Sequence, residues 1–170
     1  MTYVLDASAI ISGFVEEEGV TVPEVIEEVK DYSSEFTLES LIGSGKLDVR
    51  EPSPEAVWRV TEEVEKTKDT LSETDIRIIA LALDIQGCVV SGDYGIQNVC
   101  EILGVPYVSA GVEGIEKVLQ WTFVCIGCGR EYEDYVRECP FCGNRVVKSK
   151  KTEVGRVHSA GGEPCKGDEE

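Results

Sequence analysis

The sequence predicts an α/β fold with a parallel sheet flanked by helices, followed by a small metal-binding module. Two patterns lead to this prediction. Short apolar stretches alternate with longer helical stretches through the first two thirds of the 170 residues, the order in which parallel strands and their covering helices follow one another. Four of the seven cysteines then lie between residues 125 and 142, a section too short to bury a core of its own.

The first elements are predicted from a buried strand and two helical patterns. Residues 3–5 are apolar and open the chain as a strand, and residues 7–14 follow as a short helix. Residues 22–32 carry apolar side chains at helical spacing, which places Val25 and Val29 on one face. A further short helix and a strand are expected at 38–42 and 47–49.

Stronger helical signals follow. A charged amphipathic helix over 54–68 is opened by Pro54, since proline is favoured at the first helical positions. An apolar helix over 73–85 precedes a short apolar run at 88–91, which we interpret as a buried parallel strand. A helix over 97–103, ended by Gly104, and a strand over 105–108 complete this region.

These patterns divide the chain into four parts. We expect a first domain over residues 1–111 and a connector with a short helix over 112–120. The cysteine module should cover 121–148. Beyond it few residues are apolar, which predicts a flexible tail over 149–170.

Charge is distributed unevenly between these parts. The chain has 33 acidic and 16 basic residues and a formal charge of −17, which repels nucleic-acid phosphates unless a cation or a basic patch intervenes. Residues 1–120 hold 24 of the acids and 8 of the bases, for a net charge of −16. The section over 143–157 is locally basic, with Arg145, Lys148, Lys150, Lys151 and Arg156 against Glu153.

No apolar run approaches the ~20 residues of a membrane span, so we expect no membrane association. The N-terminus lacks the basic and apolar stretches of a secretory signal. An odd number of cysteines without such a signal favours a reducing, cytoplasmic location. In that compartment clustered cysteines are more often metal ligands than disulfides.

The cysteines form two pairs with the spacing of a metal knuckle. Cys125 and Cys128 are followed after ten residues by Cys139 and Cys142, and each pair is followed by glycine. Two residues between ligands let one tight turn aim both sulfurs at a single ion. We predict a structural zinc site, because four protein thiolates leave no position open for a substrate. Iron in a rubredoxin-like carrier is the main competing assignment.

Two aspartates follow predicted strands. Asp6 comes directly after the first strand and Asp93 comes two residues after Ser91. Ligands of parallel sheets bind beyond the carboxyl ends of strands, so the two acids are expected to face one cleft. Both are equally explained as helix N-caps.

Two further acids could join them. Asp75 lies three residues after Ser72 and opens an apolar helix, where a capping arrangement is the alternative. Glu28 is the acid nearest the buried edge of the helix over 22–32. Clustered carboxylates suit Mg²⁺ or Mn²⁺, and such ions orient a water and neutralise a transferring phosphoryl group. The reaction class would be phosphodiester hydrolysis.

Taken together, the four acids and the cysteine pairs resemble the pattern of a PIN-domain nuclease. The resemblance is closer still to the Nob family of endonucleases that mature the 3′ end of small-subunit ribosomal RNA. The order of a PIN domain and a four-cysteine zinc ribbon is distinctive of that family, and the resemblance covers roughly residues 1–148. One position departs from it, because many relatives have two adjacent acids where this chain has Gly92 and Asp93. The segments that carry the resemblance are LDAS at 5–8, TVPEVIEEV at 21–29, SETDI at 72–76 and DYGIQNV at 93–99.

The resemblance implies a PIN-like parallel sheet flanked by helices and endoribonuclease activity that depends on Mn²⁺ or Mg²⁺. The short length of the chain resembles archaeal members of the family. The resemblance also implies that Asp6, Glu28, Asp75 and Asp93 are catalytic, with Asp6, Asp75 and Asp93 binding the ion. The implied substrate is precursor small-subunit rRNA in a pre-ribosomal particle. Four basic residues of the rear section are candidate RNA contacts: Arg145, Lys148, Lys150 and Lys151.

Two other functions stay open at this point. One is a toxin-type PIN ribonuclease that acts on transfer or messenger RNA, against which the appended ribbon argues. The other is a non-catalytic RNA- or ribosome-binding module. Aromatic residues of the ribbon section could stack on bases, although such residues more often form a ribbon's own core: Trp121, Phe123, Tyr132, Tyr135 and Phe141.

Overall fold

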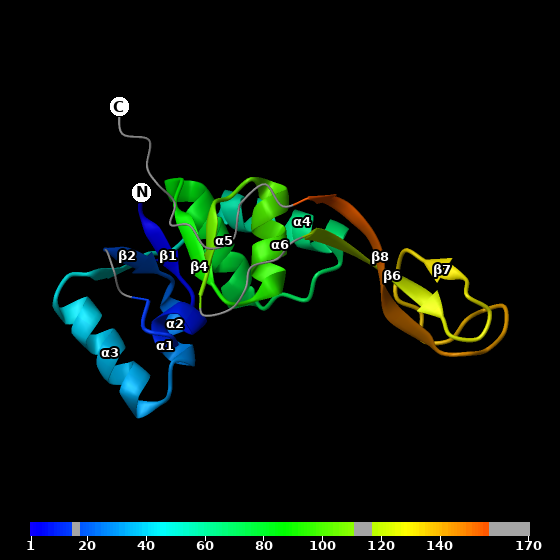
Figure 1. Ribbon diagram of the computed structural model, residues 1–170, viewed down its shortest axis with the longest axis horizontal. Helices are drawn as coiled ribbons and strands as arrows, with labels where there is room; N and C mark the ends of the chain where they lie inside the picture. Colours follow the sequence, from blue (N-terminus) through cyan, green and yellow to red (C-terminus); the bar gives the residue numbers. More distant parts are fainter. Residues whose placement is uncertain (15–17, 111–116, 157–170) are drawn as a thin grey trace.

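The computed structural model describes residues 1–14, 18–110 and 117–156, with only the backbone for 117–120 and 150–156. The chain forms a body of sheet and helices, from which a long two-stranded arm extends and carries the cysteine module at its far end (Figure 1). No helix in the described ranges is long and apolar enough to cross a membrane.

The body contains a five-stranded parallel sheet, as predicted. Its order is β3-β2-β1-β4-β5, so the chain begins at the centre, moves outward to one edge, and returns to β4 beside β1 before reaching the other edge. The reversal of direction therefore lies between β1 and β4. The strands are β1 (Tyr3–Leu5), β2 (Gly19–Thr21), β3 (Leu47–Val49), β4 (Cys88–Ser91) and β5 (Tyr107–Ser109).

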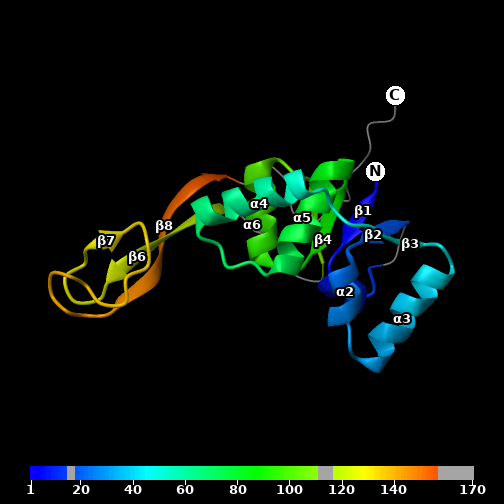
Figure 2. The same cartoon turned by 180° about the vertical axis from the view of Figure 1, so that it is seen from behind.

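Six helices in the described part of the chain cover this sheet. The later three pack against one another beside β4, and the first three form a second group near β2 and β3 (Figure 2). Every strand and helix of the body contributes at least one buried apolar side chain to a single core. The helices are α1 (Ala7–Ile11), α2 (Pro23–Glu28), α3 (Tyr32–Gly43), α4 (Pro54–Thr67), α5 (Glu73–Ile85) and α6 (Tyr94–Leu103).

Several boundaries differ from the sequence predictions. The helix expected over 22–32 ends at Glu28, because Val29 is extended. The next helix, α3, begins only at Tyr32, where Asp31 caps it by accepting a hydrogen bond from the Ser34 amide. β2 was not predicted. Its three residues follow the acidic run at 16–18 and include a glycine, so they have no clear strand pattern. β5 lies one to two residues later than expected, after Pro106.

The cysteine module belongs to a three-stranded antiparallel sheet in the order β7-β6-β8. Its strands are β6 (Lys117–Cys125), β7 (Glu131–Tyr132) and β8 (Val146–Arg156). The helix expected over 112–120 is wrong for 117–120, which lie in β6, and 111–116 are outside the described residues. The tail predicted from 149 is likewise wrong for 149–156, which lie in β8, and 157–170 are outside the described residues. Both segments are strands because they pair with each other over a long range, with Lys117 opposite Arg156.

Candidate active site and metal centre

The sheet topology brings Asp6 and Asp93 to the same edge. β1 and β4 are adjacent and parallel, with Leu5 opposite Val90, and Asp6 and Asp93 lie just beyond their carboxyl ends. This is the point at which the strand order reverses. In open parallel sheets the crevice at such a point is the usual ligand site.

Two serine hydroxyls tie these ends together. Asp6 Oδ2 accepts hydrogen bonds from Ser8 Oγ and Ser91 Oγ, each at 2.8 Å. Ser91 Oγ in turn accepts the Asp93 amide at 3.0 Å, and Ser8 Oγ accepts the Gly92 amide at 2.9 Å. The network holds the largely buried Asp6 carboxylate in one orientation. Sequence reasoning missed Ser8 and Ser91, whose only signal is a hydroxyl two residues from each aspartate.

Asp75 reaches this edge from α5. The helix leads into β4, so its N-terminus lies near the carboxyl end of the sheet, and Asp75 belongs to its first turn. Burial raises the pKa of the Asp75 carboxyl, hydrogen bonds from Ser72 oppose the shift, and the negative charges of Asp6 and Asp93 raise it further. The effect of Asp6 and Asp93 on Asp75 indicates that Asp75 lies in the same electrostatic environment as these two carboxylates.

Glu28 lies at the end of α2 and is connected to α5. Its Oε1 accepts a hydrogen bond of 2.6 Å from Thr74 Oγ1, next to Asp75 in the chain. A second link between the two helices is the ion pair of Glu24 and Arg77, at 2.8 Å. Glu28 therefore joins the edge through its neighbour Thr74, a contact that the sequence pattern did not indicate.

The capping interpretation of the aspartates is confirmed. Asp6 caps α1 through the Ala7 amide, Asp93 caps α6 through the Gly95 and Ile96 amides, and Asp75 forms a capping box with Ser72. A carboxylate has two oxygens, however, so a capping hydrogen bond to one oxygen can leave the other free to bind a cation. Within the described part of the chain, no hydrogen bond is accepted by Asp93 Oδ2, Asp75 Oδ1 or Glu28 Oε2.

The donor chemistry of this edge fits a hard cation, since its free donors are carboxylate oxygens. The site is wide: among the described residues, only the four cysteines place at least three ligand atoms within 4.8 Å of one another. Mg²⁺ keeps several waters and is commonly bound through one or two carboxylates, so its binding does not need a closed protein cage. Asp75 and Asp93 each offer a free oxygen to such an ion, whereas both oxygens of Asp6 accept hydrogen bonds.

The four cysteines form a closed cluster that could hold a metal ion. Cys125 Sγ lies 3.4 Å from Cys142 Sγ, and Cys128 Sγ lies 3.6 Å from Cys139 Sγ. A tetrahedral ion with metal–sulfur bonds of about 2.3 Å requires sulfurs roughly 3.8 Å apart, close to these distances. The arrangement can therefore hold one tetrahedral ion.

The two knuckles have the same backbone geometry. Gly129 and Gly143 both have a φ of +71°, a left-handed conformation that favours glycine. Each of these amides donates to the carbonyl of the first cysteine of its pair, at 3.0 Å and 2.9 Å. The Tyr132 hydroxyl, 2.9 Å from Cys139 Sγ, lowers the pKa of the Cys139 thiol to about 6 and thereby favours the thiolate that a metal binds.

The predicted RNA contacts lie in different surroundings. Arg145 is exposed on the ribbon, whereas the Lys148 ammonium donates to Thr70 of the body and lies over the Trp121 ring. Lys150 and Lys151 lie on β8 where only the backbone is described. Of the ribbon aromatics, Phe123 and Tyr132 pack against its small core, while Tyr135 and Phe141 are exposed.

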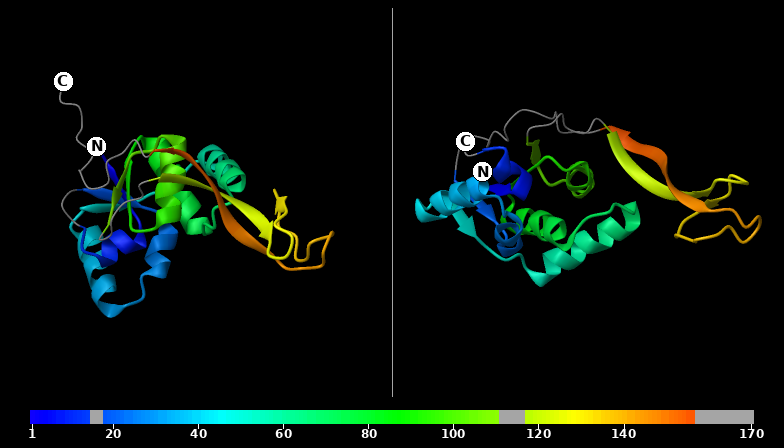
Figure 3. Two further views of the ribbon diagram at one scale, coloured as in Figure 1. Left: turned by 45° about the vertical axis from the view of Figure 1, so that its right-hand side comes forward. Right: turned by 90° about the horizontal axis from the view of Figure 1, so that it is seen from below.

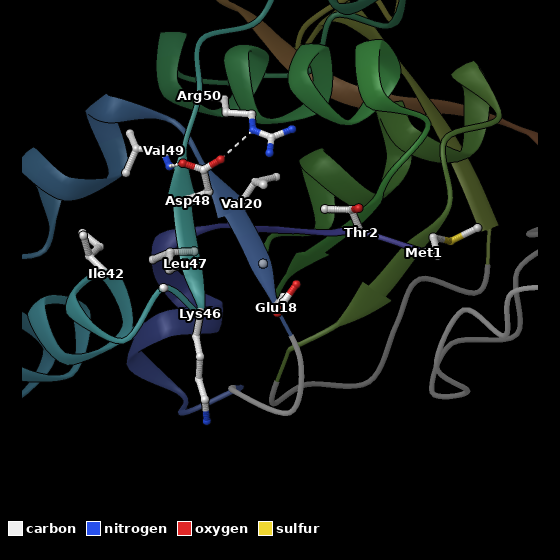
Figure 4. A pocket seen from close by; sticks show the side chains of 12 residues that line it. Met1, Thr2, Glu18, Val20, Ile42, Lys46, Leu47, Asp48, Val49 and Arg50 are labelled. Carbon is white, nitrogen blue, oxygen red and sulfur yellow. Dashed lines mark hydrogen bonds and ion pairs between the residues drawn. The ribbon is translucent and has the colours of Figure 1, made fainter.

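A groove of about 910 Å³ lies away from the four acids predicted for the active site (Figure 4). It runs along the edge strand β3 and past the amino ends of β1 and β2, the opposite end of the parallel strands from Asp6. Its charged side chains are of both signs, including the Arg50–Asp48 pair at 2.8 Å. None of the predicted site residues lines it, so we place the active site at the acidic edge instead.

Comparison with known proteins identifies the family. Residues 3–85 match the model of the PIN domain of ribonuclease. The chain is 46% identical to an endoribonuclease Nob1 of Pyrococcus abyssi, over 84% of this chain and 90% of the relative. It is 40% identical to that of Methanothermobacter thermautotrophicus, over 88% and 94%, and 34% identical to ribonuclease VapC1 of Thermoplasma acidophilum, over 87% and 78%. With a PIN-like sheet, a four-cysteine ribbon and this similarity over most of its length, the chain belongs to the Nob1 family of PIN-domain endoribonucleases.

Proposed function

We propose that this endoribonuclease hydrolyses a phosphodiester bond in precursor small-subunit rRNA and so matures its 3′ end within a pre-ribosomal particle. The proposal rests on the family and on one observation: Asp6, Asp75 and Asp93 share the edge where the sheet order reverses. The substrate assignment comes from the Nob1 relatives and from the ribbon that follows the body.

We assign Mn²⁺ or Mg²⁺ to Asp6, Asp75 and Asp93, with Glu28 completing the acidic edge. A divalent ion there would supply charge neutralisation and activation of a water at a phosphodiester. The residues contribute position: Ser8 and Ser91 hold Asp6, and Thr74 holds Glu28. Without a cation, carboxylates at this edge would repel an RNA phosphate, because like charges repel one another. The pKa of Asp75 is raised first by burial and further by the charges of Asp6 and Asp93.

The ribbon is assigned a structural zinc ion and a share of RNA binding. Zinc is the natural ion for four thiolates at these spacings. With the acids concentrated in residues 1–120, the ribbon offers the less acidic surface, and exposed Arg145 is its best-placed candidate phosphate contact. The expected division into a nuclease body ending near 111 and a ribbon that follows it is part of this proposal.

The catalytic assignment is tested with Asp93→Asn. Asparagine is as good an N-cap as aspartate, so α6 should stay folded while one carboxylate is lost. We expect Mn²⁺-dependent cleavage of a single-stranded rRNA precursor to fall by at least roughly a hundredfold, with RNA binding retained. Cleavage and binding are measured separately, by gel assay and by fluorescence anisotropy.

Asp31→Asn is the matched control, because Asp31 caps α3 in the same way but is not one of the acids that we assign to the site. It should cleave like the unaltered protein. If Asp93→Asn cleaves as fast as Asp31→Asn, the assignment of Asp93 is wrong.

The substrate is tested by mapping cleavage on a precursor that spans the 3′ end of small-subunit rRNA, with transfer and messenger RNA as competitors. A single cut at the mature end is expected. Faster cleavage of the competitors would instead favour the alternative of a toxin-type ribonuclease, which is of interest because a ribonuclease VapC1 is among the relatives.

A further inference from the structure

Three consecutive residues between α4 and α5 each contact a different part of the ribbon. At this junction β6 packs beside α4 and α6 of the body, and the arm formed by β6 and β8 leaves the body (Figure 3). The segment thus meets the ribbon at three separate points. The contacts are Lys68 Nζ to Asp134 Oδ1 at 3.1 Å, Trp121 Nε1 to Asp69 Oδ1 at 2.9 Å, and Lys148 Nζ to Thr70 Oγ1 at 3.1 Å.

Asp69 is at the centre of these contacts. Its Oδ1 accepts the indole N–H of Trp121 on β6, and its Oδ2 accepts a hydrogen bond of 2.7 Å from Asn98 Nδ2 on α6. Asn98 is only 3% exposed, so its amide is fixed within the body. One carboxylate therefore joins ribbon to body through two charge-assisted hydrogen bonds, which are stronger than neutral ones. The Lys68–Asp134 pair is more exposed and contributes little.

The backbone before Asp69 is held in a turn. α4 ends at Thr67, and Lys68 adopts a left-handed conformation with a φ of 60°, which is unfavourable for a residue with a side chain. The Asp69 amide donates to Thr67 Oγ1 at 3.4 Å, directly after this turn. The turn fixes the direction in which Asp69 leaves the helix.

The other end of the same segment supports the acidic edge. Leu71 packs against the first turn of α6, where a Cβ on Gly95 would lie only 2.8 Å from Leu71 Cδ2. Ser72 caps α5 and shares the capping box with Asp75. Residues 68–72 therefore run from the ribbon to the N-termini of the two helices that carry Asp75 and Asp93.

We propose that segment 68–72 docks the ribbon on the body, and that Asp69 is a positioning residue that sets where RNA held by the ribbon enters the acidic edge. This inference rests on the proposed function, in which both parts contact one RNA. Holding two sites at a fixed separation raises the effective concentration of the second contact and restricts which phosphodiester reaches it.

Docking is tested first without RNA, by amide and indole hydrogen exchange in the zinc-loaded full chain. The chain has two tryptophans, and Trp58, which is 66% exposed, serves as the internal reference. We expect the Trp121 indole N–H to exchange at least roughly tenfold more slowly than that of Trp58. Equal exchange of the two indoles in the unaltered protein would overturn the docking proposal.

Asp69→Asn is the sharpest variant, because it keeps the size of the side chain. Both partners of Asp69 donate hydrogen bonds, whereas asparagine offers one acceptor oxygen and one donor group, so it satisfies only one of them. Trp121→Phe removes the same contact from the ribbon side and keeps an aromatic ring. Both variants should speed exchange at the junction and retain their zinc. Trp58→Phe is the matched control.

Function is then measured on a long precursor and on a six-nucleotide RNA that cannot span both parts. For the long RNA we expect KM to rise roughly tenfold in Asp69→Asn and Trp121→Phe, kcat to change much less, and extra cleavage positions to appear. The short RNA should show a much smaller change in KM. An unchanged KM and an unchanged cleavage position on the long RNA in both variants would overturn the positioning role.

The two proposals fail in distinguishable ways. If the unaltered protein cleaves no precursor, the proposed function is wrong, and indole exchange still decides whether the ribbon docks. If the unaltered protein cleaves but the two indoles exchange alike, the function stands and the role of Asp69 is refuted.

Discussion

The body and the ribbon of this protein are stabilised in different ways. In the body, apolar side chains from every helix and strand meet in one core, and several of them are fully buried, such as Ile78 and Ile79. In the ribbon, the described residues bury only three apolar side chains, Cys125, Cys139 and Val146, two of which belong to the four-cysteine cluster. The body follows the usual rule for a domain of its size, while the ribbon has too little apolar burial to fold by that route.

This difference explains why we expect catalysis in the body and not in the ribbon. The metal centre of the ribbon is closed by four protein ligands, which suits a structural role. The acidic edge of the body has free carboxylate oxygens on a scaffold that is already stable, so a bound cation can keep positions for water and substrate. We therefore propose that one part of the molecule uses a metal to fold and that the other uses one to react.

The largest expected effect is loss of the ribbon on removal of its metal. Structural zinc sites supply about 10 kcal/mol or more of folding free energy, far beyond what three buried side chains provide. Cys139→Ser should release the ion and unfold β6, β7 and β8 near the knuckles, while the body stays folded. Zinc content and the dispersion of ¹H–¹⁵N spectra measure this.

Cys100→Ala is the matched control, since Cys100 is buried in the body core. It should lower the stability of the body slightly and leave one metal ion per chain. A folded ribbon in Cys139→Ser would show that the ribbon does not need its metal to fold. Bound iron, seen as a visible absorption band, would contradict the assignment of zinc.

The next effect is a cavity in the body. Ile79 is fully buried on α5, and replacing it with alanine should lower the free energy of unfolding by about 2–5 kcal/mol. Denaturant titration of the body signals measures the loss, and zinc binding by the ribbon should persist. Ile126→Ala, at an exposed position of the ribbon, is the control. Equal destabilisation by the two changes would show that the parts do not differ in this way.

The smallest effect concerns the charge of Asp75. Burial raises its pKa in the folded protein, so the folded state binds a proton more readily than the unfolded state. Stability contributed by this group is therefore present at low pH and is lost as the pH rises through the raised pKa. Asp75→Asn should stabilise the metal-free body by less than about 1 kcal/mol, because the site is partly exposed.

The same variant should also weaken the stabilisation that Mn²⁺ gives to the unaltered protein. Thermal unfolding with and without Mn²⁺ tests both statements. Glu73→Gln, an exposed acid in the same first turn, is the control and should change neither value much. If Mn²⁺ stabilises Asp75→Asn as much as the unaltered protein, Asp75 does not hold the ion.

Much of the body could be predicted from local patterns. The strands at 3–5 and 88–91 and the helices over 54–68 and 73–85 are confirmed, the helices to within one residue, because each has an apolar pattern of the right period. β2 escaped prediction since its three residues lack such a pattern. Residues 117–120 and 149–156 were misassigned because their strands depend on pairing with each other across some thirty residues.

The candidate site was predictable in part for the same reason. Acids after strands and at helix starts are visible in the chain, and the cysteine spacing indicates its metal directly. The hydroxyls of Ser8, Ser91 and Thr74 were missed, because each of them also bonds a partner far away in sequence. Ser91 and Asp6, for example, are separated by 85 positions. The role of Asp69 was invisible for this reason as well.

The sequence by itself determined the alternation of strands and helices, the four-thiolate centre and the identity of the acids that could act together. These are properties of short segments, set by apolar period and ligand spacing. Only the tertiary structure decided that Asp6 and Asp93 share the β1–β4 boundary and that residues 68–72 connect ribbon and body. Such contacts arise from strand order and helix packing, which depend on the whole chain and leave no local pattern to read.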